Sequence, residues 1–170
     1  DANQMHFGYD QDRLLVSVSD FAGNPYLENE YDDAGRIISQ NLAGRGTAAV
    51  SYDEQLCVTT FTDETGHETK YYYDENGHII KTESPGSSRE TLYNANGQAI
   101  QEKDALGAVT CMEYDSAGRM NRIIYPDGTS EQTVYNDRNM PTQLTGRDGT
   151  ESLFTYDEYG RMTAAQNERG

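Results

Sequence analysis

The chain has 170 residues, of which 35% are hydrophobic, and it contains 13 Tyr, 16 Gly and no Trp. So polar a composition excludes a thick two-layer core and favours a single sheet with one well-packed face. The formal net charge of −16 argues against binding to nucleic acid or to anionic membranes, since both would repel it. No apolar run is long enough for a membrane-spanning helix.

A dipeptide, Tyr-Asp or Tyr-Asn, recurs along the whole chain. Its successive spacings are 22, 21, 21, 20, 21, 21 and 21 residues. A fixed period of this kind indicates a repeat architecture. We therefore predict one array of eight repeats over residues 1–170, which begin near Tyr9, Tyr31, Tyr52, Tyr73, Tyr93, Tyr114, Tyr135 and Tyr156. The opening residues, Asp1 to Gln4, look like the interior of a sequence, so we expect the array to belong to a longer protein.

Each dipeptide opens a turn motif, as in Asp32-Asp33-Ala34-Gly35-Arg36. The first side chain can accept hydrogen bonds from the turn backbone, and Gly at the fourth position can adopt the left-handed conformation. In the seventh copy Asn139 stands at the Gly position, where it is the next-best residue. The first and third copies, which begin at Asp10 and Asp53, lack this Gly, so we expect looser turns there.

A second turn lies halfway through each repeat. Examples are 20–23, 41–44, 63–66 and 104–107, looser versions are 83–86, 125–128 and 146–149, and the chain ends on 167–170. Turns every ten or eleven residues leave strands of about seven residues, with no helical period between them. The sequence therefore predicts an all-β antiparallel meander of about sixteen strands from eight β-hairpins. In that order Cys57 and Cys111 would lie five strands apart, too far for a disulfide bond.

The turn geometry also predicts the strand register. Each Tyr should lie across from an apolar position just after the turn, and this Tyr face should be the packed one. The predicted partners, from the first repeat to the eighth, are Leu14, Ile37, Val58, Ile79, Ala99, Met120, Pro141 and Met162.

The pattern Tyr-Asp-x-x-Gly-Arg resembles the YD repeat of the Rhs family, and the resemblance covers the chain from Tyr9 to Gly170. Arg13, Arg36, Arg119 and Arg161 align with the Arg of the pattern, whereas other residue types occupy that position in the remaining copies. The residues that match the motif, and that we predict to have a structural role, are Tyr31, Asp32, Gly35, Arg36, Tyr73, Asp74, Gly77, Tyr114, Asp115, Gly118, Arg119, Tyr156, Asp157, Gly160 and Arg161.

The resemblance implies a twisted β-strip that curls toward a hollow shell. Family members include bacterial polymorphic toxins and toxin-complex components, whose shell encloses a toxic domain, and the animal teneurins, which are adhesion receptors. It therefore implies a non-catalytic shell segment, secreted or at the cell surface, whose partners are an enclosed toxin domain or other shell segments. The alternative is a cell-surface module that binds glycans or a receptor. The family's Asp-Pro self-cleavage motif is not present in this sequence.

Catalytic and metal sites are not predicted. His6, His67 and His78 fall at unrelated repeat positions, and no turn continues as a twelve-residue EF-hand loop that ends in Glu. We expect no cofactor and no enzymatic activity. A strip with two unpaired edge strands is, however, expected to self-associate.

Overall fold

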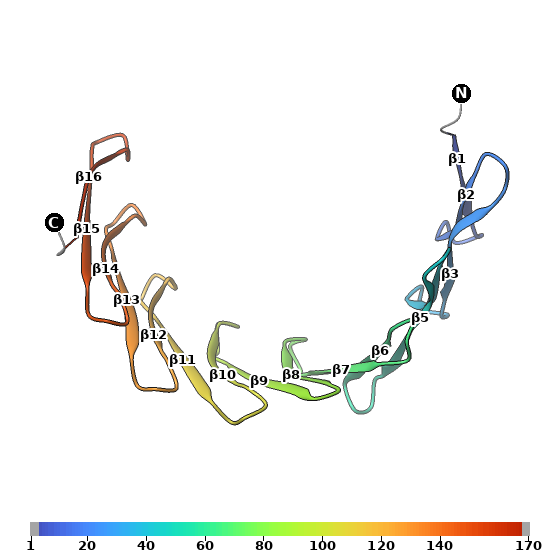
Figure 1. Cartoon of the computed structure of the whole chain (residues 1–170), viewed down its shortest axis with the longest axis horizontal. Coiled ribbons are helices and arrows are strands. Elements are labelled where there is room, and N and C mark those ends of the chain that lie inside the picture. Colours follow the sequence, from blue (N-terminus) through green and yellow to red (C-terminus); the bar gives the residue numbers. More distant parts are fainter. Residues whose placement is uncertain (1–3, 168–170) are drawn as a thin grey trace. The chain divides into compact units, whose positions relative to one another are not determined.

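The structure, a computed structural model, describes residues 4–167. All regular secondary structure in this range is β, in sixteen strands, and the hydrogen-bonded strand order follows the sequence from β1 to β16 (Figure 1). Every described strand pair is antiparallel, as in β3 with β4 and β11 with β12. The predicted meander is confirmed, and the predicted curl toward a hollow shell stays a prediction. The turn predicted at 167–170 and the opening residues 1–3 lie outside the described residues.

The chain divides into two compact units, with the boundary between Ser88 and Arg89. The first unit contains β1 (Met5–Tyr9), β2 (Leu15–Asp20), β3 (Pro25–Tyr31), β4 (Ile37–Leu42), β5 (Gly46–Asp53), β6 (Val58–Thr62), β7 (Glu68–Tyr73) and β8 (Ile79–Ser84). β9 (Ser87–Tyr93) spans the boundary. The second unit continues with β10 (Ala99–Lys103), β11 (Val109–Tyr114), β12 (Met120–Ile124), β13 (Ser130–Tyr135), β14 (Pro141–Thr145), β15 (Glu151–Tyr156) and β16 (Met162–Asn167).

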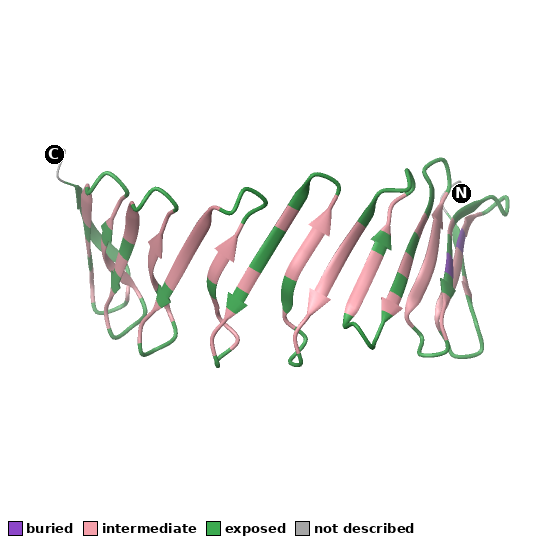
Figure 2. Ribbon diagram, turned by 90° about the horizontal axis from the view of Figure 1, so that it is seen from below, coloured by how far each residue is buried: buried purple, intermediate pink, exposed green. Residues whose placement is uncertain are grey.

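Within each unit the strands form a single layer, so most side chains are only half-buried (Figure 2). On β13, Thr133 and Tyr135 are half-buried, whereas Gln132 and Val134, which point to the other face, are exposed. Among residues 4–167 the only buried apolar side chain is that of Val18. The Tyr face is thus the better shielded of the two, but it is not the packed face that we expected, because within each unit no second layer covers it.

The predicted register is confirmed in six of the eight repeats. Tyr31 lies across from Ile37 and Tyr73 from Ile79 in the first unit, and Tyr114 lies across from Met120 in the second. The other three pairs are Tyr93 with Ala99, Tyr135 with Pro141, and Tyr156 with Met162. In each repeat the register shifts by one residue beside the Tyr, as expected where a three-residue turn ends in a left-handed residue.

The register prediction is wrong in the first repeat, where Tyr9 pairs with Leu15 instead of Leu14. Arg13 has a φ of 65° and donates its backbone N–H to the Asp10 carbonyl, so Arg13 occupies the Gly position of the turn. Leu14 therefore stands at the Arg position. The alignment of Arg13 with the Arg of the motif is wrong by one residue.

The prediction is also wrong in the third repeat, where Tyr52 pairs with Thr59 and Asp53 with Val58. Here Cys57, one residue beyond the usual Gly position, adopts the left-handed conformation with a φ of 52°. Leu56 at the Gly position has a branched side chain that disfavours this conformation. The loop consequently lengthens by one residue, and the register shift beside the Tyr is lost.

Candidate functional site, the ladder of Tyr-Asp turns

The turn Asp is the hydrogen-bonding centre of each regular repeat. The Oδ1 atom of Asp32 accepts the backbone N–H groups of Ala34 at 3.0 Å and Arg36 at 2.9 Å. The Gly35 N–H donates to the Asp32 carbonyl at 2.9 Å, and Gly35 has a φ of 76°. The predicted positive φ values of Gly77, Gly118 and Gly160 are also confirmed. The side chain of the Asp and the conformation of the Gly together close the turn.

In four turns the residue five positions after the Tyr contacts the second carboxylate oxygen of the turn Asp. Arg119 donates from Nε to Asp115 Oδ2 at 2.7 Å, and Arg36 and Arg161 do the same in their turns. His78 takes this place beside Asp74, with 2.9 Å between Nδ1 and Oδ2.

In the fifth turn both partners change, and Asn94 donates to Gln98 Oε1 at 2.9 Å. The pair at these two positions is therefore Asp with Arg in three turns, Asp with His in one and Asn with Gln in the fifth, and the contact is kept in all five.

These contacts stabilise the charged form of the turn carboxylates. The side chain of Arg119, followed by its backbone N–H, lowers the pKa of Asp115 below its ordinary value. At Asp157 the backbone N–H of Arg161 is the main cause of a lowered pKa. At Asp63, in a half-repeat turn, the Thr65 hydroxyl and the His67 backbone lower the pKa to about 2.

The lowered pKa values predict how stability depends on pH. A carboxylate whose pKa is lower in the folded than in the unfolded chain stabilises the fold above the unfolded pKa, and this contribution is lost as the pH falls through the folded pKa. We expect the melting temperature, followed by circular dichroism, to be level from pH 7 to about 4.5 and to fall between about pH 4 and 2. The decrease in melting temperature over this pH range should be smaller in the variant Asp63→Asn, because its side chain keeps an acceptor oxygen but cannot titrate. A profile identical to that of the unaltered chain would contradict this role of Asp63.

A second set of contacts joins each turn to the preceding repeat through the Tyr hydroxyl. Tyr31 donates to the carbonyl of Leu15 at 2.8 Å, and Tyr114 donates to that of Ala99 at 2.8 Å. Tyr52, Tyr135 and Tyr156 make the same bond to Ile37, Met120 and Pro141. The acceptor is in every case the residue that follows the previous turn. The Tyr of the motif therefore links neighbouring repeats, a role that we did not predict from the sequence.

Removing one of these hydroxyls should weaken the fold measurably. We expect Tyr114→Phe to lower the free energy of unfolding by about 0.5–1.5 kcal/mol, because the Ala99 carbonyl loses its side-chain donor. Urea denaturation measures this difference. Tyr26→Phe is the matched control, since the Tyr26 side chain is exposed on β3, and it should change stability little. Equal effects of the two substitutions would contradict a specific role for the Tyr114 hydroxyl.

Two of the turn Arg residues join their own repeat to the following repeat, whereas the Tyr hydroxyls join theirs to the preceding one. The guanidinium of Arg36 lies over the ring of Tyr52 in the next repeat at 4.3 Å, and its Nη1 contacts Glu54 at 3.0 Å. Arg119 lies over Tyr135 at 4.8 Å. It also donates to the Asn136 carbonyl and to Asn139 Oδ1 in the following turn. Stacked guanidinium groups of this kind combine cation–π attraction with hydrogen bonding.

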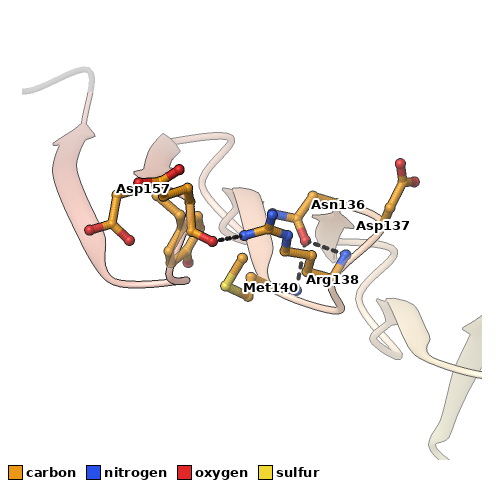
Figure 3. Close-up of a pocket in the computed structure, with 7 residues that line it drawn as sticks. Asn136, Asp137, Arg138, Met140 and Asp157 are labelled. Carbon is orange, nitrogen blue, oxygen red and sulfur yellow. Dashed lines mark hydrogen bonds between the residues drawn. The ribbon is translucent and has the colours of Figure 1, made fainter.

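The depression between the seventh and eighth turns is lined by such bridging groups (Figure 3). Arg138 extends from the seventh turn and donates to the carbonyl of Glu158 in the eighth, while Asn136 Oδ1 accepts the backbone N–H of Arg138. Met140 and Tyr156 supply apolar surface beside them. Arg138 thus joins the seventh turn to the eighth across this depression, which indicates a structural role for it.

The fifteen residues predicted for the motif lie in four turns, and each turn gathers its own members. The three histidines do not come together: His67 lies 3.5 Å from Asp63, His78 pairs with Asp74, and His6 lies on β1. Within residues 4–167 no group of three or more His, Cys, Asp or Glu side chains is arranged to hold a metal ion, and no helix is long and apolar enough to cross a membrane. Cys57 and Cys111 are free thiols.

Tyr-Asp turns at a fixed period, joined by hydroxyl and guanidinium contacts, define a YD-repeat β-sheet protein. The model of the teneurin YD-shell matches residues 1–106, and the model of the RHS repeat matches residues 93–130 and 135–170. The chain therefore belongs to the Rhs family of YD-repeat proteins. No curated protein matches the sequence significantly.

Solved structures of toxin-complex proteins share the fold. The Photorhabdus luminescens Tc holotoxin pore carrying the mutation TccC3-D651A is 12% identical, with a TM-score of 0.51 over 97% of this chain. The crystal structure of TcdB2-TccC3 is 12% identical, with a TM-score of 0.51 over 96% of this chain. This chain covers only 12% and 13% of the chains in those two structures.

Proposed function

We propose that this chain is a non-catalytic structural segment of an Rhs-type β-shell that encloses a toxin or other cargo, in a protein that is secreted or displayed at the cell surface. The recurrence of the Tyr hydroxyl contact carries the proposal. In both units the contact joins a repeat to the one before it, at Tyr31, Tyr52, Tyr114, Tyr135 and Tyr156, so the same strip can be extended by further repeats. A β-sheet of this kind can be extended by adding repeats and does not need a conventional hydrophobic core.

The uneven burial of the two faces supports a role in enclosure. Phe154 and Tyr156 on β15 are half-buried on the Tyr face, although no other layer of the same unit covers them. A partly apolar face of this kind suits contact with cargo or with other shell segments. The net charge of −16 would keep the assembled wall soluble.

Limited proteolysis of the full polypeptide that carries these repeats tests the enclosure. We expect the candidate cargo segment to resist trypsin within the folded polypeptide and to be cleaved at least tenfold faster when it is expressed alone. Equal cleavage rates in the two contexts would contradict enclosure.

A second candidate function is cell-surface recognition of a glycan or a receptor, which is favoured by the teneurin YD-shell match over residues 1–106. Direct binding of the 170-residue chain to a glycan array, lost when exposed aromatic residues such as Tyr26 are replaced by Ala, would favour this function. Enclosure does not require such binding.

A further inference from the structure

The half-repeat turn between β4 and β5 lacks the side-chain contacts that close the half-repeat turns before and after it. Its Arg45 N–H donates to the Leu42 carbonyl at 2.9 Å. In the two neighbouring turns the residue that corresponds to Leu42 is Asp20 or Asp63, and each accepts two backbone N–H groups of its own turn through Oδ1. The Leu42 side chain cannot accept a hydrogen bond, and no side chain of residues 4–167 bonds to the backbone of residues 42–46. Backbone hydrogen bonds alone therefore close this turn.

The same turn contains two glycines in the left-handed region. Gly44 has a φ of 77° and Gly46 a φ of 114°. Glycine loses more conformational freedom than any other residue when its backbone is fixed, so holding two of them in place is costly. Residues 43–47 are all exposed. A turn with these features should open more often than its neighbours, and exposed tips of small residues are preferred sites of proteolytic cleavage.

Arg45 lies between the two glycines, and its side chain is free. Of the basic side chains in residues 4–167, only those of Arg13 and Arg45 make no ion pair, hydrogen bond or ring contact. Arg13 lies in a turn that is closed by a side chain, because Asp10 Oδ1 accepts the N–H groups of Asp12 at 2.9 Å and Leu14 at 2.8 Å. A free basic side chain and an open turn therefore coincide at Arg45.

From these observations we propose that the Arg45–Gly46 peptide bond is a processing site for a trypsin-like endoproteinase, which cleaves it before any other bond in residues 4–167 of the folded chain. Such an enzyme binds a free Arg or Lys side chain in an acidic pocket beside the bond that it cleaves. Water adds across this bond and gives a carboxylate on Arg45 and an amine on Gly46. The proposal does not rest on the proposed function, because it concerns this turn alone.

The cleaved chain stays assembled. β4 and β5 flank the turn and pair along their length. At the opposite ends of these strands the Tyr52 hydroxyl donates to the Ile37 carbonyl at 2.9 Å, and the Arg36 guanidinium lies over the Tyr52 ring at 4.3 Å. These contacts do not involve the cleaved bond, so they hold the two fragments together.

Limited proteolysis with trypsin, with the products identified by mass spectrometry, tests the site. We expect the first cleavage within residues 4–167 to give a fragment that begins at Gly46. Arg45→Gln should slow the first cleavage in this range at least about fivefold, whereas Arg13→Gln should leave its rate unchanged. Arg13 is the matched control, since its side chain is also free but its turn is closed by Asp10. A first cleavage at another bond, or equal effects of the two Gln variants, would overturn the proposal.

Moving the Arg to a closed turn separates the effect of the turn from that of the Arg side chain. The double variant Arg45→Gln/Ala22→Arg creates an exposed Arg-Gly bond before Gly23, in the turn that Asp20 closes. We expect cleavage of this bond to be at least about fivefold slower than cleavage after Arg45 in the unaltered chain. Size-exclusion chromatography of the cleaved unaltered chain should give one species that contains both fragments. Equal cleavage rates at the two positions, or separate elution of the fragments, would contradict the proposal.

Discussion

Replacing Gly118 by Val is expected to lower the free energy of unfolding by about 2 kcal/mol or more, measured by urea denaturation. Gly118 has a φ of 80°, a conformation that a β-branched residue strongly disfavours. A Cβ atom there would also lie 3.4 Å from Gln98 Nε2, which donates to the Gly118 carbonyl from the preceding turn. The substitution should therefore strain its own turn and weaken the contact with the neighbouring one.

Two further variants test the cost of the left-handed conformation by itself. Gly77→Val should cost less than Gly118→Val, because Gly77 has a similar φ of 82° but nothing within 4 Å of the added Cβ atom. Arg13→Gly should instead stabilise the chain by about 0.5–1 kcal/mol, because it relieves a left-handed Arg. Unfolding curves of both Val variants that coincide with the curve of the unaltered chain would contradict the turn assignment.

Replacing Arg119 by Ala is expected to lower the melting temperature by about 5 °C. This side chain pairs with Asp115, lies over the Tyr135 ring and bonds to two groups of the next turn, so its loss removes contacts within a repeat and between repeats. Arg119→Lys should be nearly as harmful, because an ammonium group cannot reproduce the planar, branched set of contacts. Differential scanning calorimetry measures these shifts.

Arg161→Ala is the matched control within the same chain. Arg161 makes the same contact with its turn Asp, but it lies over no ring of a following repeat. Its loss should shift the melting temperature by no more than about 1 °C at concentrations where the chain is monomeric. Similar shifts for Arg119→Ala and Arg161→Ala would show that the contact between repeats contributes little.

The strand order, the turns and most of the register could be predicted because they depend on local contacts. The hydrogen bonds that close a regular turn join Asp32 to residues no more than four positions away, and the Gly at the fourth position marks the left-handed conformation directly. The predictions were wrong where the Gly is replaced. In the first repeat Arg13, at the Gly position, adopts the left-handed conformation. In the third repeat Leu56 stands at the Gly position, but the left-handed residue is the next one, Cys57.

The contacts between repeats were harder to predict because they join residues 15 to 20 positions apart. The Tyr hydroxyl bonds end on backbone carbonyls, which carry no mark in the sequence. A signal for the guanidinium stacking does exist, since Arg36 precedes Tyr52 and Arg119 precedes Tyr135 by the same sixteen residues. The half-buried state of the Tyr face was not predicted, because the polar composition indicated a single sheet but not how far one face of such a sheet is shielded from solvent.

In both units, stability therefore arises mainly between adjacent strands and adjacent turns. Within each unit the strands contact their sequence neighbours, and in residues 4–167 one apolar side chain alone, that of Val18, is buried. A sheet built in this way should behave as a linear array, in which the loss of whole repeats removes stability in proportion and leaves the remaining repeats folded.

Deleting two whole repeats, from Asp115 through Tyr156, tests this claim most directly, because it joins Tyr114 to Asp157 and restores the motif at the junction. Equilibrium unfolding in urea, followed by circular dichroism, reports both the stability and the surface exposed on unfolding. We expect a folded β-sheet whose denaturant dependence, the m-value, is lower by about a quarter, in proportion to the repeats removed. An unfolded product, or an unchanged m-value, would contradict it.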